Sequence, residues 1–105
     1  MTVYAVAQLS IHDRERYERY AARFMDVLAG SAGRLLAADG APEVLSGAWP
    51  HDKLVLVEFP DRAAFEQWAC SPAYMEIATD RIAATTGSAV LVTGIPHDSM
   101  VAARP

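Results

Sequence analysis

The chain has 105 residues, enough for one compact domain, and its 52% hydrophobic and 21% charged residues are typical of a globular protein. The formal net charge of −4 argues against a nucleic-acid partner, because binding phosphates requires clustered Lys and Arg. The single cysteine excludes an internal disulfide. The sequence has no basic, apolar leader and no stretch near the roughly 20 apolar residues of a membrane helix, so we expect a soluble cytoplasmic protein with no membrane partner.

The amino-terminal third predicts a strand followed by a helix. Apolar residues occupy alternate positions from Val3 to Ile11, which is the period of a strand. Asp13 is a typical helix N-cap, and from Arg14 onward the apolar residues recur with a helical period. We expect Gly30 and Gly33 to end this helix.

The middle of the chain predicts three strand segments. Residues 34–38 and 43–46 are two short apolar runs separated by turn residues at 39–42. Residues 53–59 alternate leucines with β-branched valines, and they form the strongest strand pattern in the chain.

A second helical region is expected to begin after Asp61, which is another typical N-cap. It is interrupted at Ser71-Pro72, where proline suits the first turn of a restarted helix. We expect the restarted helix to run to about Thr86, with Gly87 as its C-terminal stop. A last strand is expected over residues 89–93.

The order strand, helix, strand, strand, helix, strand predicts an α+β fold of the ferredoxin-like βαββαβ type, an antiparallel sheet with the helices on one face. We expect residues 1–94 to form this domain and residues 95–105 to be a C-terminal tail, mobile or packed on a partner subunit. The uncovered face would carry Tyr4, Val6 and alternate residues of 53–59. An apolar face of this kind predicts a homodimer joined through the sheets, and the alternative is a monomer whose tail covers the face.

Arg81 is the residue most indicative of a site. Motifs for metal, nucleotide and acyl-transfer chemistry do not occur at the required spacings, so we expect no metal and no cofactor. Helical spacing, however, places Arg81 near the middle of the face that points at the sheet, where an unpaired guanidinium is costly. Its partner is either Glu58, in a closed ion pair, or the anion of a ligand, unless the side chain extends past the helix edge into water.

A ligand cleft between the helices and the sheet is therefore the second interpretation of this helix face. Arg34, at the start of the second predicted strand, is a further candidate for the cleft, and the alternative is a charge that protects a sheet edge from aggregation. Catalytic residues stay unassigned. The candidate substrate-binding residues are Tyr17, Tyr20, Arg34, Glu58, Tyr74 and Arg81.

Short segments spread from Val3 to Gly94 form a combined pattern. They are Tyr17-Glu18-Arg19-Tyr20, Gly33-Arg34-Leu35-Leu36, the run from Pro42 to Pro50, Val57-Glu58-Phe59-Pro60-Asp61-Arg62, and Ser71-Pro72-Ala73-Tyr74 with Arg81 downstream. Together these segments resemble the family known as domain of unknown function 1330. The resemblance implies a ferredoxin-like fold that pairs into a dimeric α/β barrel, and it implies no activity, because the family has none assigned.

The resemblance supports a function only by fold analogy, since proteins of this fold include cofactor-independent monooxygenases, lactone isomerases, haem-degrading enzymes and stress-response proteins. The first hypothesis is a cofactor-independent enzyme, monooxygenase- or isomerase-like, that acts on a small aromatic or carbonyl compound with Glu58 as base. The alternative is a non-catalytic ligand-binding or stress-associated dimer, and haem binding comes last, because no histidine is well placed. An enzyme needs a titratable group of shifted pKa beside an open pocket, whereas a binding protein needs only the pocket.

Overall fold

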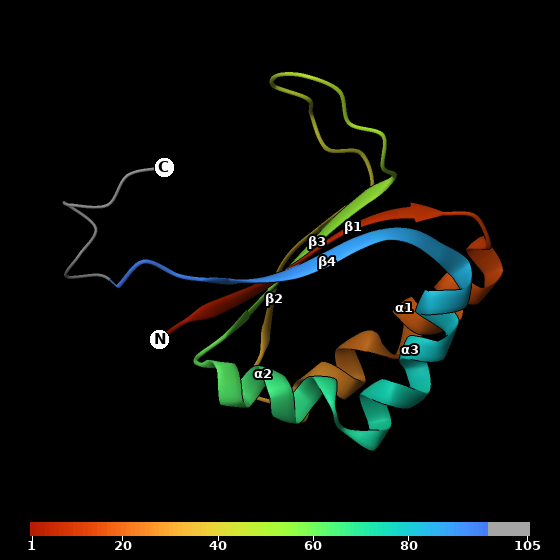
Figure 1. Ribbon diagram of the computed structural model, residues 1–105. Coiled ribbons are helices and arrows are strands. Elements are labelled where there is room, and N and C mark those ends of the chain that lie inside the picture. The colour runs from red at the N-terminus through yellow and green to blue at the C-terminus, as the bar shows by residue number, and fades with distance from the viewer. Residues whose placement is uncertain (97–105) are drawn as a thin grey trace.

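The computed structural model describes residues 1–96 as a four-stranded antiparallel sheet with all helices on one of its faces (Figure 1). In chain order the elements are β1 (Val3–Ile11), α1 (Arg14–Ala29), β2 (Arg34–Asp39), β3 (Lys53–Phe59), α2 (Arg62–Ala69), α3 (Pro72–Ala84) and β4 (Thr85–Thr93). The strand order across the sheet is β2-β3-β1-β4. This is the ferredoxin-like βαββαβ arrangement with its second helix divided in two, and it confirms the predicted fold class.

Capping hydrogen bonds fix where the three helices begin. Asp13, Asp61 and Ser71 each accept the backbone N–H three residues further on, at 3.2, 2.8 and 3.1 Å. Each such cap contributes about 1 kcal/mol, so these residues define the helix starts expected from the sequence. None of the helices within residues 1–96 is both long enough and apolar enough to cross a membrane.

The strand predicted over residues 43–46 is wrong. Residues 40–52 instead form one long connection between β2 and β3, and it leaves the sheet on the side away from the helices (Figure 1). The segment lies between Pro42 and the positive-φ Gly47, and no strand of residues 1–96 pairs with it, so its apolar residues do not become part of the sheet. Leu45 is accordingly 91% exposed.

The predicted end of the last helix is also wrong. Helix α3 ends at Ala84 and β4 begins directly at Thr85, because two β-branched threonines favour the strand. Gly87 is therefore not a helix stop but a strand residue with φ of +138°. A Cβ at Gly87 would collide with the carbonyl oxygen of Gln8 on β1, so the close pairing of β1 with β4 requires glycine here.

The core lies between the helices and the inner face of the sheet. Strands β1 and β3 contribute Val3, Leu9, Val57 and Phe59, all at most 5% exposed. Gly33 packs so closely that a Cβ there would come within 2.5 Å of the Phe59 ring. The large helical side chains buried against these strands are Tyr17, Tyr20, Phe24, Leu28, Trp68 and Ile77.

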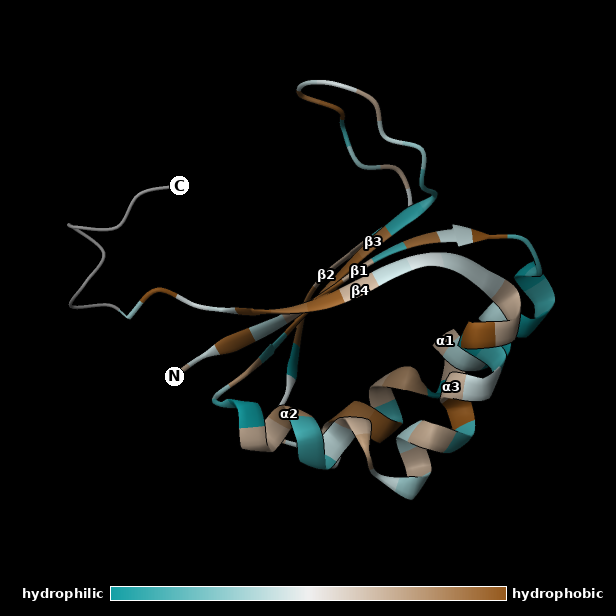
Figure 2. Cartoon of the chain, viewed as in Figure 1, coloured by the Kyte–Doolittle hydropathy of each residue, from teal (hydrophilic) through white to brown (hydrophobic). Residues whose placement is uncertain are grey.

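No helix of residues 1–96 covers the other face of the sheet (Figure 2), and the strand register gives this face a group of apolar residues. Strand register places Val6 between Leu56 of β3 and Val90 of β4, with Val92 beside Tyr4. Val90 and Val92 are 54% and 43% exposed. We call this surface the outer face, and its apolar residues are Tyr4, Val6, Leu54, Leu56, Val90 and Val92.

The described chain ends just beyond β4. The backbone N–H of Gly94 donates to the carbonyl oxygen of Thr2 at 2.7 Å, which ties the end of β4 to the start of β1. Ile95 is 56% exposed. Most of the predicted tail, residues 97–105, lies outside the described residues, so its packing stays a prediction.

Candidate functional site

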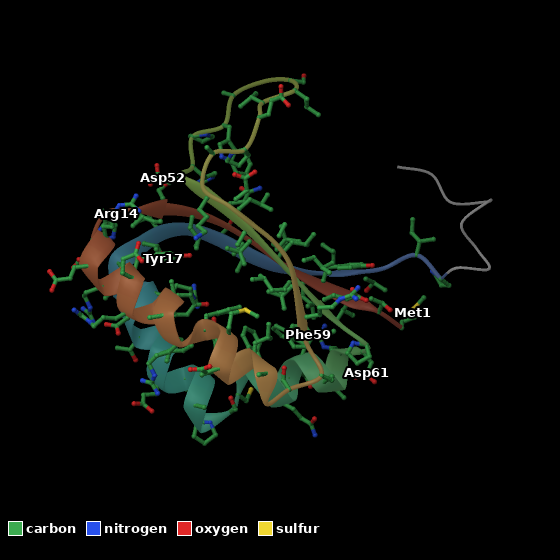
Figure 3. All side chains as sticks on the ribbon, turned by 180° about the vertical axis from the view of Figure 1, so that it is seen from behind. Met1, Arg14, Tyr17, Asp52, Phe59 and Asp61 are labelled. Atoms are coloured by element: carbon green, nitrogen blue, oxygen red, sulfur yellow. The ribbon has the colours of Figure 1, made fainter. Side chains whose placement is uncertain are left out.

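A cavity of about 570 Å³ lies between the inner face of the sheet and the helices, and Tyr17 projects toward it from α1 (Figure 3). Protein interiors are normally filled, so a cavity needs small side chains where large ones would otherwise pack. The alanines that line it are Ala5, Ala7, Ala21, Ala38, Ala69, Ala78 and Ala89. The volume is in the range of small-molecule sites.

Four aromatic rings form one wall of the cavity, which we call the aromatic wall: Trp68, Tyr74, Tyr20 and Tyr17. Neighbouring ring centroids along this row are 4.0, 6.3 and 5.7 Å apart. The hydroxyl groups of Tyr20 and Tyr74 are hydrogen-bonded at 3.2 Å, which links α1 to α3. The structure thus brings together the three tyrosines proposed for the cleft.

Arg81 of α3 lines the same cavity, and no carboxylate of residues 1–96 pairs with it. Its Nε atom is buried without a hydrogen-bond acceptor, and no salt bridge within residues 1–96 includes its side chain. Its positive charge acts on the neighbouring Tyr17 and Tyr20. The interpretation of Arg81 as a closed ion pair with Glu58 is therefore wrong.

Glu58 and Arg34 lie apart from the cavity. They are cross-strand neighbours on β3 and β2, and Arg34 Nη2 is 3.0 Å from Glu58 Oε2. Glu58 lies opposite Tyr4 of β1 in the strand register, so both residues are on the outer face of the sheet. Neither residue lines the cavity, so the structure gives Glu58 no position from which to act as a base there.

Burial shifts the titration of two cavity phenols. Burial raises the pKa of Tyr17 and raises that of Tyr20 strongly, and in Tyr20 the adjacent Tyr74 adds to the effect. The nearby charge of Arg81 opposes the shift in both residues but is the smaller effect. Both phenols therefore stay protonated at neutral pH and act as hydrogen-bond donors or acceptors rather than as bases.

Two side chains with polar groups that line the cavity, Lys53 and Trp68, were not among the predicted site residues. Lys53, the first residue of β3, lines the cavity with its Nζ 5.2 Å from the centre of the Tyr17 ring. Trp68 also lines the cavity, and its Nε1 is buried without an acceptor within residues 1–96. Lys53 could have been identified from the sequence, because it is a charged residue at the start of the strongest predicted strand. Trp68 could not, because the sequence does not distinguish an indole packed in the core from one that lines a cavity.

A group of polar contacts at the C-terminal end of β1, around Ser10 and Ile11, involves the long connection of residues 40–52 rather than the cavity. The Ser10 hydroxyl lies 3.2 Å from His51 Nδ1, and the His51 ring contacts Trp49 edge-on at 5.4 Å. The Asp52 carboxylate accepts the backbone N–H of Ile11 at 2.7 Å. These contacts hold the connection against β1. Within residues 1–96, no group of three or more His, Cys, Asp or Glu could hold a metal ion.

Solved structures with the same arrangement are distant in sequence. A Rhodopseudomonas palustris protein of unknown function, RPA0582, superposes with a TM-score of 0.76 at 18% identity, over 90% of this chain and 83% of that one. A dimeric ferredoxin-like protein of unknown function from Jannaschia sp. CCS1 gives 0.69 at 16%, over 90% and 100%. SnoaB, a cofactor-independent oxygenase from Streptomyces nogalater, gives 0.67 at 19%, over 90% and 94%. At these identities the likeness shows the fold alone.

Family membership rests on a match along nearly the whole described chain. No curated protein matches the sequence. One family model does, over residues 2–95, a range that includes all four strands, the three helices and every residue of the cavity. The chain therefore belongs to the family Domain of unknown function (DUF1330).

Proposed function

We propose that this protein is a homodimer that binds a small aromatic or carbonyl compound in the cavity between its sheet and its helices. The observation that carries the proposal is the cavity itself, about 570 Å³ and mostly apolar, with a few polar groups converging on it. Small-molecule sites have this combination, because the apolar walls supply affinity and the polar groups fix orientation.

The outer face supports the homodimer. An apolar surface spread over three adjacent strands is unusual on a monomer, and a second copy of the same sheet is a complementary cover for it. The Jannaschia protein of the same fold is described as dimeric. Dimerisation through this face leaves the space between the sheet and the helices open to ligand, since of the outer-face residues only Val6 and Val90 also border the cavity.

A cofactor-independent enzyme is the second candidate, and the fold likeness to SnoaB favours it. Arg81, Lys53 and the protonated phenols would stabilise an enolate or phenolate oxygen. Binding stands first because the cavity lining within residues 1–96 includes no carboxylate and no imidazole to take a proton. Product formation without added cofactor, followed by mass spectrometry, would distinguish the enzyme from the binding protein.

Binding is tested with the uncharged fluorescent probe N-phenyl-1-naphthylamine. We expect saturable fluorescence enhancement with the parent protein, and a loss of affinity of roughly ten-fold or more in Ala78→Leu, whose larger side chain enters the cavity. The matched control is Ala83→Leu, an exposed position of the same helix that does not line the cavity. Absence of probe binding to the parent, or equal loss in both variants, would contradict the proposed function.

A further inference from the structure

Two buried hydrogen-bond donors of the cavity have no acceptor within residues 1–96. They are Trp68 Nε1 and Arg81 Nε, and both residues line the cavity. Nearly all buried polar groups in folded proteins are paired, because an unpaired one forfeits its hydration. Since both groups can only donate, the partner that enters the cavity has to supply acceptor atoms.

The two carboxylates on the same helix as Arg81 pair with arginines of α1. Asp80, the neighbour of Arg81 in sequence, lies 3.0 Å from Arg16 Nε and 3.7 Å from Arg19 Nη2 of α1. Glu76, also on α3, pairs with an arginine of α1 at 3.2 Å. These pairs hold α1 and α3 together on their outward side. Arg81 is thus left as the cation of α3 that faces inward.

The charged side chains that line the cavity are all positive within residues 1–96. Arg81 and Lys53 both line it, while no Asp or Glu within residues 1–96 does, although the whole chain carries a net charge of −4. Lys53 lies over the Tyr17 ring, which leaves the guanidinium as the cation with neither a carboxylate nor a ring partner in the described chain. A partly buried guanidinium with an unpaired Nε is best satisfied by an anionic oxygen group, through charge-assisted hydrogen bonds.

The opposite wall of the cavity suits a flat apolar body. Inner-face residues such as Ala5, Ala7 and Val55 present small or β-branched side chains toward the aromatic wall. We propose that the ligand is an aromatic compound with one anionic oxygen group, a carboxylate in its simplest form, held with the anion at Arg81 and the ring system against the aromatic wall. This inference rests on the proposed function and narrows its ligand class.

The test compares 2-naphthoate with 2-naphthalenemethanol, which has nearly the same shape and no charge, by isothermal titration of the full-length protein. We expect the parent to bind the carboxylate roughly ten-fold or more tightly than the alcohol. Arg81→Met should lose this preference while it keeps its affinity for the alcohol. The control Arg62→Met removes an exposed arginine of α2 that pairs with Glu66, and it should keep the preference.

The outcomes separate this inference from the proposed function. Equal affinity for the two probes, or a preference that survives in Arg81→Met, would overturn the anionic ligand class and leave the cavity as a binding site. Binding of neither probe would overturn both. The melting temperature of Arg81→Met without ligand should equal or exceed that of the parent. A marked decrease, or a failure to fold, would show that the guanidinium is already satisfied inside the protein and would also overturn the inference.

Discussion

The buried phenols of Tyr17 and Tyr20 make the stability of the fold depend on pH in the alkaline range. Burial raises the pKa of both above the usual value of 10.0. In the unfolded chain the same groups ionise near pH 10. A group whose pKa is raised in the folded state therefore contributes its full stability below pH 10, and this contribution is lost as the pH rises toward the folded-state value.

We therefore expect the free energy of unfolding to fall above pH 10, by about 1.4 kcal/mol per pH unit for each phenol that stays protonated in the folded state. Tyr20→Phe should reduce this slope. It also loses the hydrogen bond to Tyr74 and so costs about 1 kcal/mol at every pH. Urea unfolding between pH 8 and pH 11, followed by tryptophan fluorescence, measures both effects. A slope identical to that of the parent would show that Tyr20 ionises in the folded protein.

At the scale of single elements, the parts that were predictable are those that local chemistry determines. Residues 3–11 and 53–59 were expected as strands with the bounds they have, because alternation and β-branched residues act within the segment itself. The N-caps Asp13 and Asp61 were identifiable for the same reason, since a cap needs only the first turn of its own helix.

The errors concern features that depend on distant residues. Residues 43–46 have a strand composition, but a strand requires a neighbour to pair with, and composition does not reveal one. Glu58 was expected near Arg81, yet the pairing of β3 with β2 brings it to Arg34 instead. The cavity itself was inferred from Arg81 and the tyrosines, whereas the alanines that create its volume carry no signal until the sheet and helices are assembled.

Gly87 is the position where this dependence on a distant residue is strongest. Its φ of +138° and its contact with the Gln8 carbonyl lead us to expect that Gly87→Ala weakens the pairing of β4 with β1. Backbone strain alone costs on the order of 1–3 kcal/mol, and the collision adds to it. The control Gly40→Ala, where a Cβ meets nothing within 4 Å, should stay within about 0.5 kcal/mol of the parent. Urea unfolding of the two variants at pH 8 measures the difference, and equal stabilities would contradict the strand geometry.

At the scale of the whole molecule, the sheet separates two apolar environments, and β1 contributes to both. Ala5 and Ala7 lie on the inner face and line the cavity, while Tyr4 and Val6 lie on the outer face, although Val6 also borders the cavity. Alternation along one central strand therefore supplies the space for a ligand on one side and a surface for association on the other. No part of residues 1–96 covers the outer face, so burial of its apolar residues requires a second molecule.

Val6 is central to that surface, because it pairs with Leu56 on one side and Val90 on the other. We expect the parent protein to sediment at twice the mass of the chain, and Val6→Asp to sediment as the monomer at micromolar concentration. The physical reason is that an unpaired carboxylate buried in a sheet interface costs several kcal/mol. The matched control is Ala22→Asp on the exposed side of α1, which adds the same charge outside the proposed interface and should leave the dimer intact. A monomeric parent, or a Val6→Asp variant that remains dimeric while Ala22→Asp dissociates, would place the interface elsewhere or remove it. Circular dichroism of Val6→Asp completes the test, since a folded monomer separates loss of association from loss of the fold.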